Sequence, residues 1–232
     1  MSGNYYTHFQ FGSRPQDMNT EKEKKNIHVA RLPVIGVTGP SGAGKSLFCS
    51  FLSDLGWRVL DCDLIYRKMT DRPSACTREL ALEGNFGSGI LLTDGSLDRG
   101  AMAKIVFSED GSEKLSLLNK ITHKYVISSI KRRISHPGNN RTGFVIDAPL
   151  LFQADIGKDC DLTVAVTAPR ELRSSRIIAR DSIAPDAAEA RLSAAMPEEW
   201  FSERADLTVF NDGDSSLLEA RAREIDAMLR GG

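Results

Sequence analysis

The segment over residues 39–46 constrains the fold of this chain more than any other. It reads Gly-Pro-Ser-Gly-Ala-Gly-Lys-Ser and fits the pattern G-x-x-x-x-G-K-S/T without a mismatch. An apolar run over residues 32–37 precedes it, and apolar residues at helical spacing follow over 47–55. In this order of strand, glycine-rich turn and helix, backbone N–H groups and the helix N-terminus can face an anion. The sequence therefore predicts a phosphate-binding loop in a nucleotide-binding α/β domain.

The positions of this loop have separable chemical roles. The glycines let backbone N–H groups turn toward phosphate oxygens. Lys45 can reach the β- and γ-phosphates, and the Ser46 hydroxyl can bind Mg²⁺, so the pattern implies Mg²⁺ bound with a nucleotide. The residues expected to contact the nucleotide are Gly39, Ser41, Gly42, Ala43, Gly44, Lys45, Ser46 and Leu47.

Further apolar runs place the loop in a parallel sheet. Residues 57–60 are a second strand candidate and complete a strand–helix–strand unit, whose two strands are parallel. Three later candidates cover 143–147, 162–167 and 207–210. Continuous apolar strands are typical of a sheet that is covered on both faces. We therefore expect an α/β fold, a P-loop NTPase-type parallel five-stranded sheet flanked by helices.

The other segments of the chain are mostly helical. Residues from about 70 to 135 carry helical periodicity, most clearly over 113–134, and form an insert between the second and third strands. Two helices are expected after Pro169, and a last one over 215–229. Residues 1–30 show no sustained period, and we interpret them as a flexible N-terminal extension of one domain over 31–232.

Charge and cysteine content exclude several classes of protein. Thirty basic residues against 31 acidic ones leave a net charge of −1, whereas binding nucleic acid or a membrane surface by charge needs a large positive excess. No apolar run reaches the roughly 18 residues of a membrane helix. The four cysteines form no C-x-x-C pair, which favours a reduced cytoplasmic protein without a zinc site. We expect no nucleic-acid partner and no membrane partner.

Two carboxylates follow the second strand. Asp61 and Asp63 are two residues apart, so an extended backbone would place both on one face. At this edge of an open parallel sheet, a carboxylate can accept a proton from an attacking hydroxyl or organise Mg²⁺ through water. The alternative is that one of them caps the helix expected from Leu64. Arg67, one turn into that helix, is expected on the side of Asp63, where it could hold an anionic acceptor.

Four arginines lie close together after Pro169. Arg173, Arg176 and Arg180 are spaced three and four apart and share one helix face, and Arg170 precedes them. Arginines that clamp a transferring phosphoryl group supply electrostatic stabilisation. The alternative is an exposed basic face, and we favour Arg176 and Arg180 as functional residues.

Short segments in a shared order resemble the dephospho-coenzyme A kinase family, over residues from about 34 to 230. The segments are the first strand and loop, Asp54-Leu55-Gly56, Val59-Leu60-Asp61-Cys62-Asp63, Arg67, Asp94-Gly95, Leu97-Asp98-Arg99, Val106-Phe107, Ala148-Pro149-Leu150-Leu151-Phe152, Arg176, Arg180-Asp181, Ala205-Asp206 and Asn211-Asp212-Gly213. The resemblance implies a five-stranded parallel core, a helical acceptor-binding insert over about 70–135 and a mobile lid over about 173–200.

The resemblance also implies a reaction, in which ATP phosphorylates the ribose 3′-hydroxyl of dephospho-coenzyme A in the last step of coenzyme A synthesis. Asp63 would be the base, and Lys45, Arg176 and Arg180 would stabilise the transferring phosphoryl group. Asn211 would join the ATP site. The implied acceptor-binding residues are Asp63, Arg67, His123, Pro149 and Leu150. ATP and dephospho-coenzyme A would be the partners, with Mg²⁺, in a monomer or weak homo-oligomer.

Several positions depart from the family pattern. Pro40 and Ser41 change the loop, Leu47 follows its serine, Lys124 follows His123, and Gln153 stands where the family usually has Glu. His123 has an alternative interpretation as a packed or surface residue. Two other functions stay open, a P-loop kinase acting on another nucleoside or nucleotide, and a nucleotide-binding regulatory protein without transfer activity.

Overall fold

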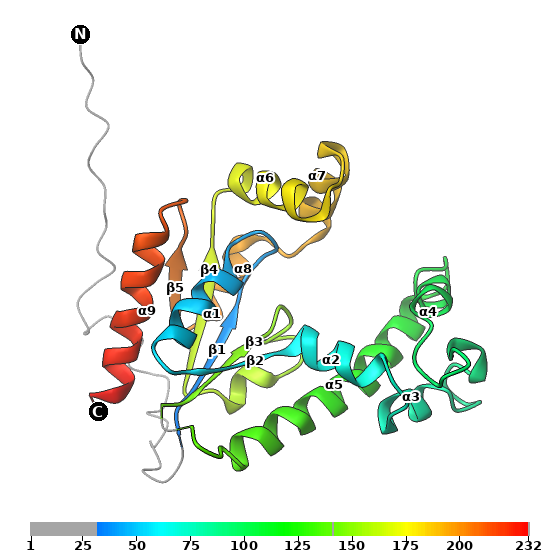
Figure 1. The fold of residues 1–232 in the computed structure, drawn as a ribbon. Coiled ribbons are helices and arrows are strands. Elements are labelled where there is room, and N and C mark those ends of the chain that lie inside the picture. The colour runs from blue at the N-terminus through cyan, green and yellow to red at the C-terminus, as the bar shows by residue number, and fades with distance from the viewer. Residues whose placement is uncertain (1–31, 141, 232) are drawn as a thin grey trace. The chain divides into compact units, whose positions relative to one another are not determined.

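The computed structural model describes residues 32–140 and 142–231, and the predicted N-terminal extension lies outside them. Its centre is one five-stranded sheet in the order β2-β3-β1-β4-β5, with every pair parallel (Figure 1). The strands are β1 Val34–Thr38, β2 Arg58–Asp61, β3 Phe144–Asp147, β4 Leu162–Thr167 and β5 Leu207–Phe210. The predicted parallel five-stranded sheet is confirmed. The first two strands are parallel as expected, but β3 lies between them.

Helices cover both faces of this sheet. The longer ones are α1 Lys45–Asp54, α2 Cys62–Thr70, α4 Arg99–Val106, α5 Ser112–Ser135, α6 Arg170–Asp181, α7 Pro185–Ala194 and α9 Ser215–Arg230. The shorter ones are α3 Ala75–Leu80, α8 Glu198–Ser202 and the 3₁₀ turns η2 Ser88–Ile90 and η3 Ile156–Asp159. Two helices were expected after Pro169, and α8 is an additional short helix before β5. In the described residues no helix has the length and apolar character needed to cross a bilayer.

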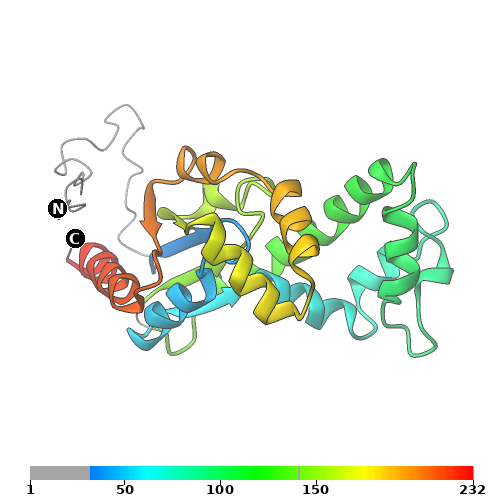
Figure 2. The same cartoon turned by 90° about the horizontal axis from the view of Figure 1, so that it is seen from above.

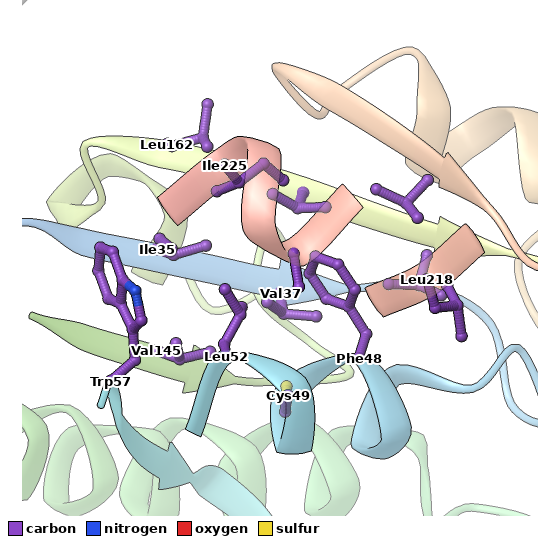
Figure 3. Packing of buried hydrophobic residues seen from close by; sticks show 14 of the residues in the cluster. Ile35, Val37, Phe48, Cys49, Leu52, Trp57, Val145, Leu162, Leu218 and Ile225 are labelled. Carbon is purple, nitrogen blue, oxygen red and sulfur yellow. The ribbon is translucent and has the colours of Figure 1, made fainter. Parts of the chain in front are cut away.

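One core lies between the sheet and the helices α1 and α9 (Figure 3). Alternate strand residues such as Ile35 and Val37 point into it, because side chains along a strand alternate between the two faces. Phe48 and Leu52, four apart on α1, fill the space against Leu218 of α9. Both α1 residues are fully buried, and burying such a side chain contributes roughly 1.5–3 kcal/mol. This packing fixes the start of α1 relative to the sheet.

The second core lies on the opposite face of the sheet. Val34 and Ile146 point into it and meet Ile65 of α2 and Val126 of α5. The N-terminal part of α5 continues beyond the sheet and packs with α3, η2 and α4 around a separate cluster that includes Leu80. Figure 2 shows these helices to one side of the sheet. The insert expected over about 70–135 is therefore helical, and α5 belongs to both it and the sheet packing.

Candidate active site

The glycine-rich loop joins β1 to α1 at the carboxyl edge of the sheet. Gly39 has φ of 137°, and a Cβ there would lie 2.0 Å from the carbonyl oxygen of Val166 in β4. Gly44 has φ of 100° and is the N-cap of α1. A Cβ at Gly44 would lie 2.2 Å from Nδ2 of Asn211. Only glycine fits either position, so the loop lies directly against the sheet on one side and against the segment after β5 on the other.

Lys45 closes the first half of the loop. Its ammonium donates to the carbonyl oxygens of Gly39 at 2.8 Å and Pro40 at 3.1 Å. Burial lowers the pKa of Lys45, and the nearby carboxyl of Asp147 opposes that shift. The ammonium therefore lies over the loop at the N-terminus of α1, where a bound anion would be stabilised.

Three side chains from later in the chain hold the second half of the loop. Arg173 Nε donates to the Ser41 carbonyl at 3.0 Å, and Arg176 Nη1 donates to the Gly42 carbonyl at 3.2 Å. Asn211 Nδ2 donates to the Ala43 carbonyl at 2.8 Å. All five consecutive carbonyls from Gly39 to Ala43 thus accept a hydrogen bond from a side chain.

These bonds orient the peptide groups of the loop. In a planar trans peptide the C=O and the following N–H point in opposite directions. Holding each carbonyl on one side therefore turns the next N–H to the other side, where an anion can accept it. The N–H of Ala43 is an exception, since it donates to the Pro40 carbonyl at 3.3 Å. Asn211, expected in the ATP site, is buried, and its amide bonds the loop and Arg176.

An open groove of about 310 Å³ lies beside the first turn of α1. Ser46, Asp61 and Asp147 all line it, and Ser46 and Leu47 are exposed on that turn. Hydroxyl and carboxylate oxygens are the ligands that Mg²⁺ prefers, partly through water. The donor set of this groove therefore fits a magnesium ion carried by a nucleotide.

Asp61 and Asp63 have different roles in the structure. Asp61 is the N-cap of α2, and its Oδ1 accepts the backbone N–H of Leu64 at 2.8 Å. Because α2 already begins at Cys62, the backbone between the two aspartates is not extended, and the expectation that both share an extended strand face is wrong. Asp63 is exposed in the first turn of α2. Desolvation and Asp61 raise its pKa, while Arg67 and Lys45 lower it.

Asp147 is a site residue that sequence reasoning missed. It ends β3 and is in register with Val37 of β1 and Asp61 of β2. Burial raises its pKa to about 6, against the opposing charge of Lys45. The available signal was an acidic residue at the end of an apolar strand, the same pattern that identified the carboxylates after the second strand.

A pocket of about 250 Å³ opens next to Asp63. It lies between α2, α5 and the segment after β3, and is lined by Cys62, Asp63, Tyr66, Leu118, Asn119, Thr122, His123, Val126, Ala148, Pro149, Leu150, Ala154 and Ile156. Four of the five residues expected to bind the acceptor are in this set, and Arg67 is not. Burial lowers the pKa of His123, which favours a neutral imidazole at pH 7.

Sequence reasoning also missed three polar residues of this pocket, Tyr66, Asn119 and Thr122. The spacing of Tyr66 and Asn119 carried a usable signal. Tyr66 is three residues after Asp63 on α2, and Asn119 is four residues before His123 on α5, so each shares a helix face with an expected site residue.

The arginine face of α6 points at the loop. Arg176 and Arg173 bond its carbonyls, and Arg180 Nη2 lies 3.4 Å from the Ser41 hydroxyl oxygen. Arg180 is also paired with Asp181, with Nε 2.7 Å from Oδ1. Arg170 instead turns to Glu189 of α7, with Nη2 2.8 Å from Oε2. Three of the four arginines therefore meet the loop. Arg170 and Arg180 are both exposed, so the exposed-face alternative is wrong only for Arg173 and Arg176.

The family model described as dephospho-CoA kinase matches residues 33–216. The chain belongs to the dephospho-CoA kinase family. The resemblance found in the sequence is thereby confirmed, and the chain is a kinase, for which ATP is the co-substrate.

Curated relatives agree with membership of the dephospho-CoA kinase family. A dephospho-CoA kinase of Carboxydothermus hydrogenoformans is 36% identical over 200 residues, which cover 86% of this chain and 94% of the relative. A dephospho-CoA kinase of Moorella thermoacetica is 35% identical over 192 residues, covering 82% and 89%. The residues matched by the family model span the sheet, the insert and the arginine helix.

Solved structures show the same architecture. A crystal structure of a Thermus thermophilus protein has a TM-score of 0.70 at 30% identity, covering 86% of this chain and 98% of that protein. A dephospho-CoA kinase from Campylobacter jejuni has a TM-score of 0.53 at 23% identity, covering 86% of this chain and 98% of that protein. At that identity the likeness shows the fold alone.

Proposed function

We propose that this chain transfers the γ-phosphoryl group of ATP to the ribose 3′-hydroxyl of dephospho-coenzyme A, the last step of coenzyme A synthesis. One observation carries the proposal. Asp63 lines the acceptor pocket, and its carboxyl is close enough to Lys45 of the phosphate loop for the ammonium to lower its pKa. A hydroxyl bound in the pocket would thus meet both a proton acceptor and the phosphate site.

The transfer step follows from that arrangement. The 3′-oxygen forms a bond to the γ-phosphorus while the bond from that phosphorus to the bridging oxygen of ADP breaks. Asp63 accepts the proton of the hydroxyl. Lys45, Arg176 and Arg180 stabilise the negative charge on the transferring group. Ser46 and, through water, the groove carboxylates would hold the Mg²⁺ that binds with ATP, and this ion would neutralise further charge.

The pocket suits the nucleoside part of the acceptor. Its walls are mainly apolar, and its polar groups are few and lie on α2 and α5, as in sites that fix the orientation of a small molecule. We assign Asp63, His123, Pro149 and Leu150 to the acceptor on this ground. Arg67 lies outside the pocket lining, and its charge is placed to hold an anionic group of the acceptor near Asp63.

The division of the chain fits this scheme. We propose one kinase domain over 31–232, with the insert over about 70–135 binding the acceptor and the segment over about 173–200 acting as a lid. Lid closure would exclude water and so limit ATP hydrolysis. The four cysteines are buried and free, which supports a cytoplasmic location. We further propose a monomer or weak homo-oligomer that binds no nucleic acid.

An ADP-release assay tests the function. The protein is incubated with Mg-ATP, with and without dephospho-coenzyme A, and coenzyme A is quantified by mass spectrometry. We expect acceptor-dependent ADP release in a one-to-one ratio with coenzyme A, and its loss in Lys45→Ala. ADP release that is stimulated instead by a nucleoside or nucleotide from a panel would show that this compound, and not dephospho-coenzyme A, is the acceptor. ATP binding without turnover of any acceptor would reject transfer altogether.

A further inference from the structure

Arg173 is a charged side chain in a buried place. Only 5% of the residue is exposed. In the described part of the chain no carboxylate forms an ion pair with it, and Glu198 of α8 acts on it only as a more distant charge. Burying a guanidinium is costly unless its donors are used. Its Nε is used, and the acceptor is the Ser41 carbonyl of the phosphate loop, at 3.0 Å.

The backbone of α6 touches the loop at the same residue. A Cβ on Gly42 would lie 2.7 Å from the carbonyl oxygen of Arg173 and 2.9 Å from its Cα. The backbones of the helix and the loop are therefore in direct contact, and the buried side chain of Arg173 lies beside Ser41.

The bonded carbonyl belongs to one particular peptide group. The C=O of Ser41 and the N–H of Gly42 share a plane and point in opposite directions. Among the described residues, the Gly42 N–H has no bond to another backbone carbonyl. A rotation of this peptide would turn the carbonyl oxygen, which is partly negative, toward the place where phosphate binds.

We propose that Arg173 is a positioning residue for the nucleotide phosphates, which acts by holding the Ser41–Gly42 peptide so that its N–H faces the anion. The proposal rests on the ATP site of the proposed function. It separates Arg173 from Arg176 and Arg180, which are assigned to the transferring group. Arg173 does not need to touch the nucleotide, because the hydrogen bond from its Nε to the Ser41 carbonyl holds the peptide. The charge of the guanidinium is not needed for this.

Two substitutions of matched length separate the hydrogen bond from the charge. In Arg173→Gln the amide Nε2 is attached to Cδ, as Nε is in arginine, so the donor is kept and the charge is lost. In Arg173→Met a methyl group takes the same place, and both are lost. Binding is measured without acceptor, by titration of a fluorescent ATP analogue with Mg²⁺, and kcat and KM are then measured for both substrates.

We expect Arg173→Met to weaken binding of the ATP analogue about tenfold and to raise the KM for ATP, as loss of the hydrogen bond to the Ser41 carbonyl predicts. Arg173→Gln should bind the analogue within about threefold of the unaltered protein. The KM for dephospho-coenzyme A should not change in either variant. In amide NMR spectra, the response of Gly42 to the nucleotide should be lost in Arg173→Met and kept in Arg173→Gln.

Arg170→Met is the matched control, because Arg170 is on the same helix but turns to Glu189, and it should bind like the unaltered protein. Equal weakening in Arg173→Gln and Arg173→Met would overturn the proposal, since charge would then be the cause. Unchanged binding in Arg173→Met would also overturn it. If Arg173→Met does not fold, Arg173→Gln decides alone. If the protein binds ATP but does not phosphorylate dephospho-coenzyme A, the proposed acceptor is wrong. The role of Arg173 can still be tested, because binding of the ATP analogue is measured without acceptor.

Discussion

Asp147 at the end of β3 is in register with Asp61 at the end of β2. Neighbouring residues in a parallel pair point to the same face of the sheet, so the two carboxylates lie side by side at its carboxyl edge. Asp61 is held by the N-terminus of α2, whereas Asp147 is half-buried and close to Lys45. The shared groove with Ser46 makes this pair the acidic part of the phosphate site.

The first prediction concerns the stability of the protein against pH. Burial raises the pKa of Asp147 to about 6 from 3.8, so the folded state binds the proton more tightly than the unfolded state. The contribution of Asp147 to the free energy of unfolding is therefore present below about pH 4 and is lost as pH rises through about 6. Asp147→Asn should remove this loss, about 1–3 kcal/mol.

Urea unfolding at pH 4.5 and pH 7.5 measures this effect. The free energy of unfolding of Asp147→Asn, minus that of the unaltered protein, should be larger at pH 7.5 than at pH 4.5. The turnover of the variant with Mg-ATP should fall. Asp159→Asn is the control, because the carboxylate of Asp159 is exposed and paired to Lys131. Equal stability differences at both pH values would contradict the pKa given for Asp147.

The second prediction concerns the proposed base. Asp63→Asn keeps the shape of the side chain and removes its ability to accept a proton. We expect kcat to fall by about 10² to 10⁴ while ATP affinity stays unchanged. Single-turnover kinetics with saturating ATP and dephospho-coenzyme A measures the loss. Turnover equal to that of the unaltered protein would show that Asp63 is not the base.

The third prediction uses the charge beside that base. Arg67 lowers the pKa of Asp63, which desolvation raises. In Arg67→Gln the pKa of Asp63 should therefore rise, and the acid limb of the profile of kcat/KM against pH should move to higher pH. Lys68→Gln is the neighbouring control and should leave the limb in place. If the acid limb does not move in Arg67→Gln, the group whose titration controls the rate is not Asp63.

The fourth prediction concerns Arg180, which is shared between Asp181 and the loop. Its hydrogen bond to the Ser41 hydroxyl is long, at 3.4 Å, while its bonds to Asp181 are 2.7 and 2.9 Å. We expect the contact with the phosphoryl group to strengthen in the transition state, so Arg180→Ala should lower kcat by about 10²-fold and change ATP affinity less. Arg223→Ala on α9 is the control. If Arg180→Ala weakens ATP binding but leaves kcat unchanged, Arg180 does not have this role.

The sequence could predict the parts of the site whose signal is local. The loop over 39–46 and the five strands depend on residue type and spacing within a few positions, and the structure has them in the expected places. The neighbours of each strand depend on contacts between distant segments. The position of β3 between β1 and β2 therefore could not be read from the strand–helix–strand unit, and the pairing of Asp147 with Asp61 depends on that position.

The different roles of Asp61 and Asp63 show a second limit of prediction from the sequence. Both residues could cap a helix, and the choice depends on whether α2 begins at residue 62 or 64, a difference smaller than a sequence pattern resolves. The burial of Arg173 shows a third limit. Its spacing from Arg176 and Arg180 placed it on the same face, but the burial that distinguishes it comes from contact with the loop more than 130 positions earlier.

The five carbonyl contacts of the loop also bear on the order in which the site can be assembled. Their donors stand at positions 45, 173, 176 and 211. A nascent chain that has emerged only through β4 contains the whole phosphate-binding motif but not the side chains that orient its second half. Competence to hold a nucleotide should consequently arrive late in synthesis, when β5 joins the edge of the sheet and brings Asn211 under the loop.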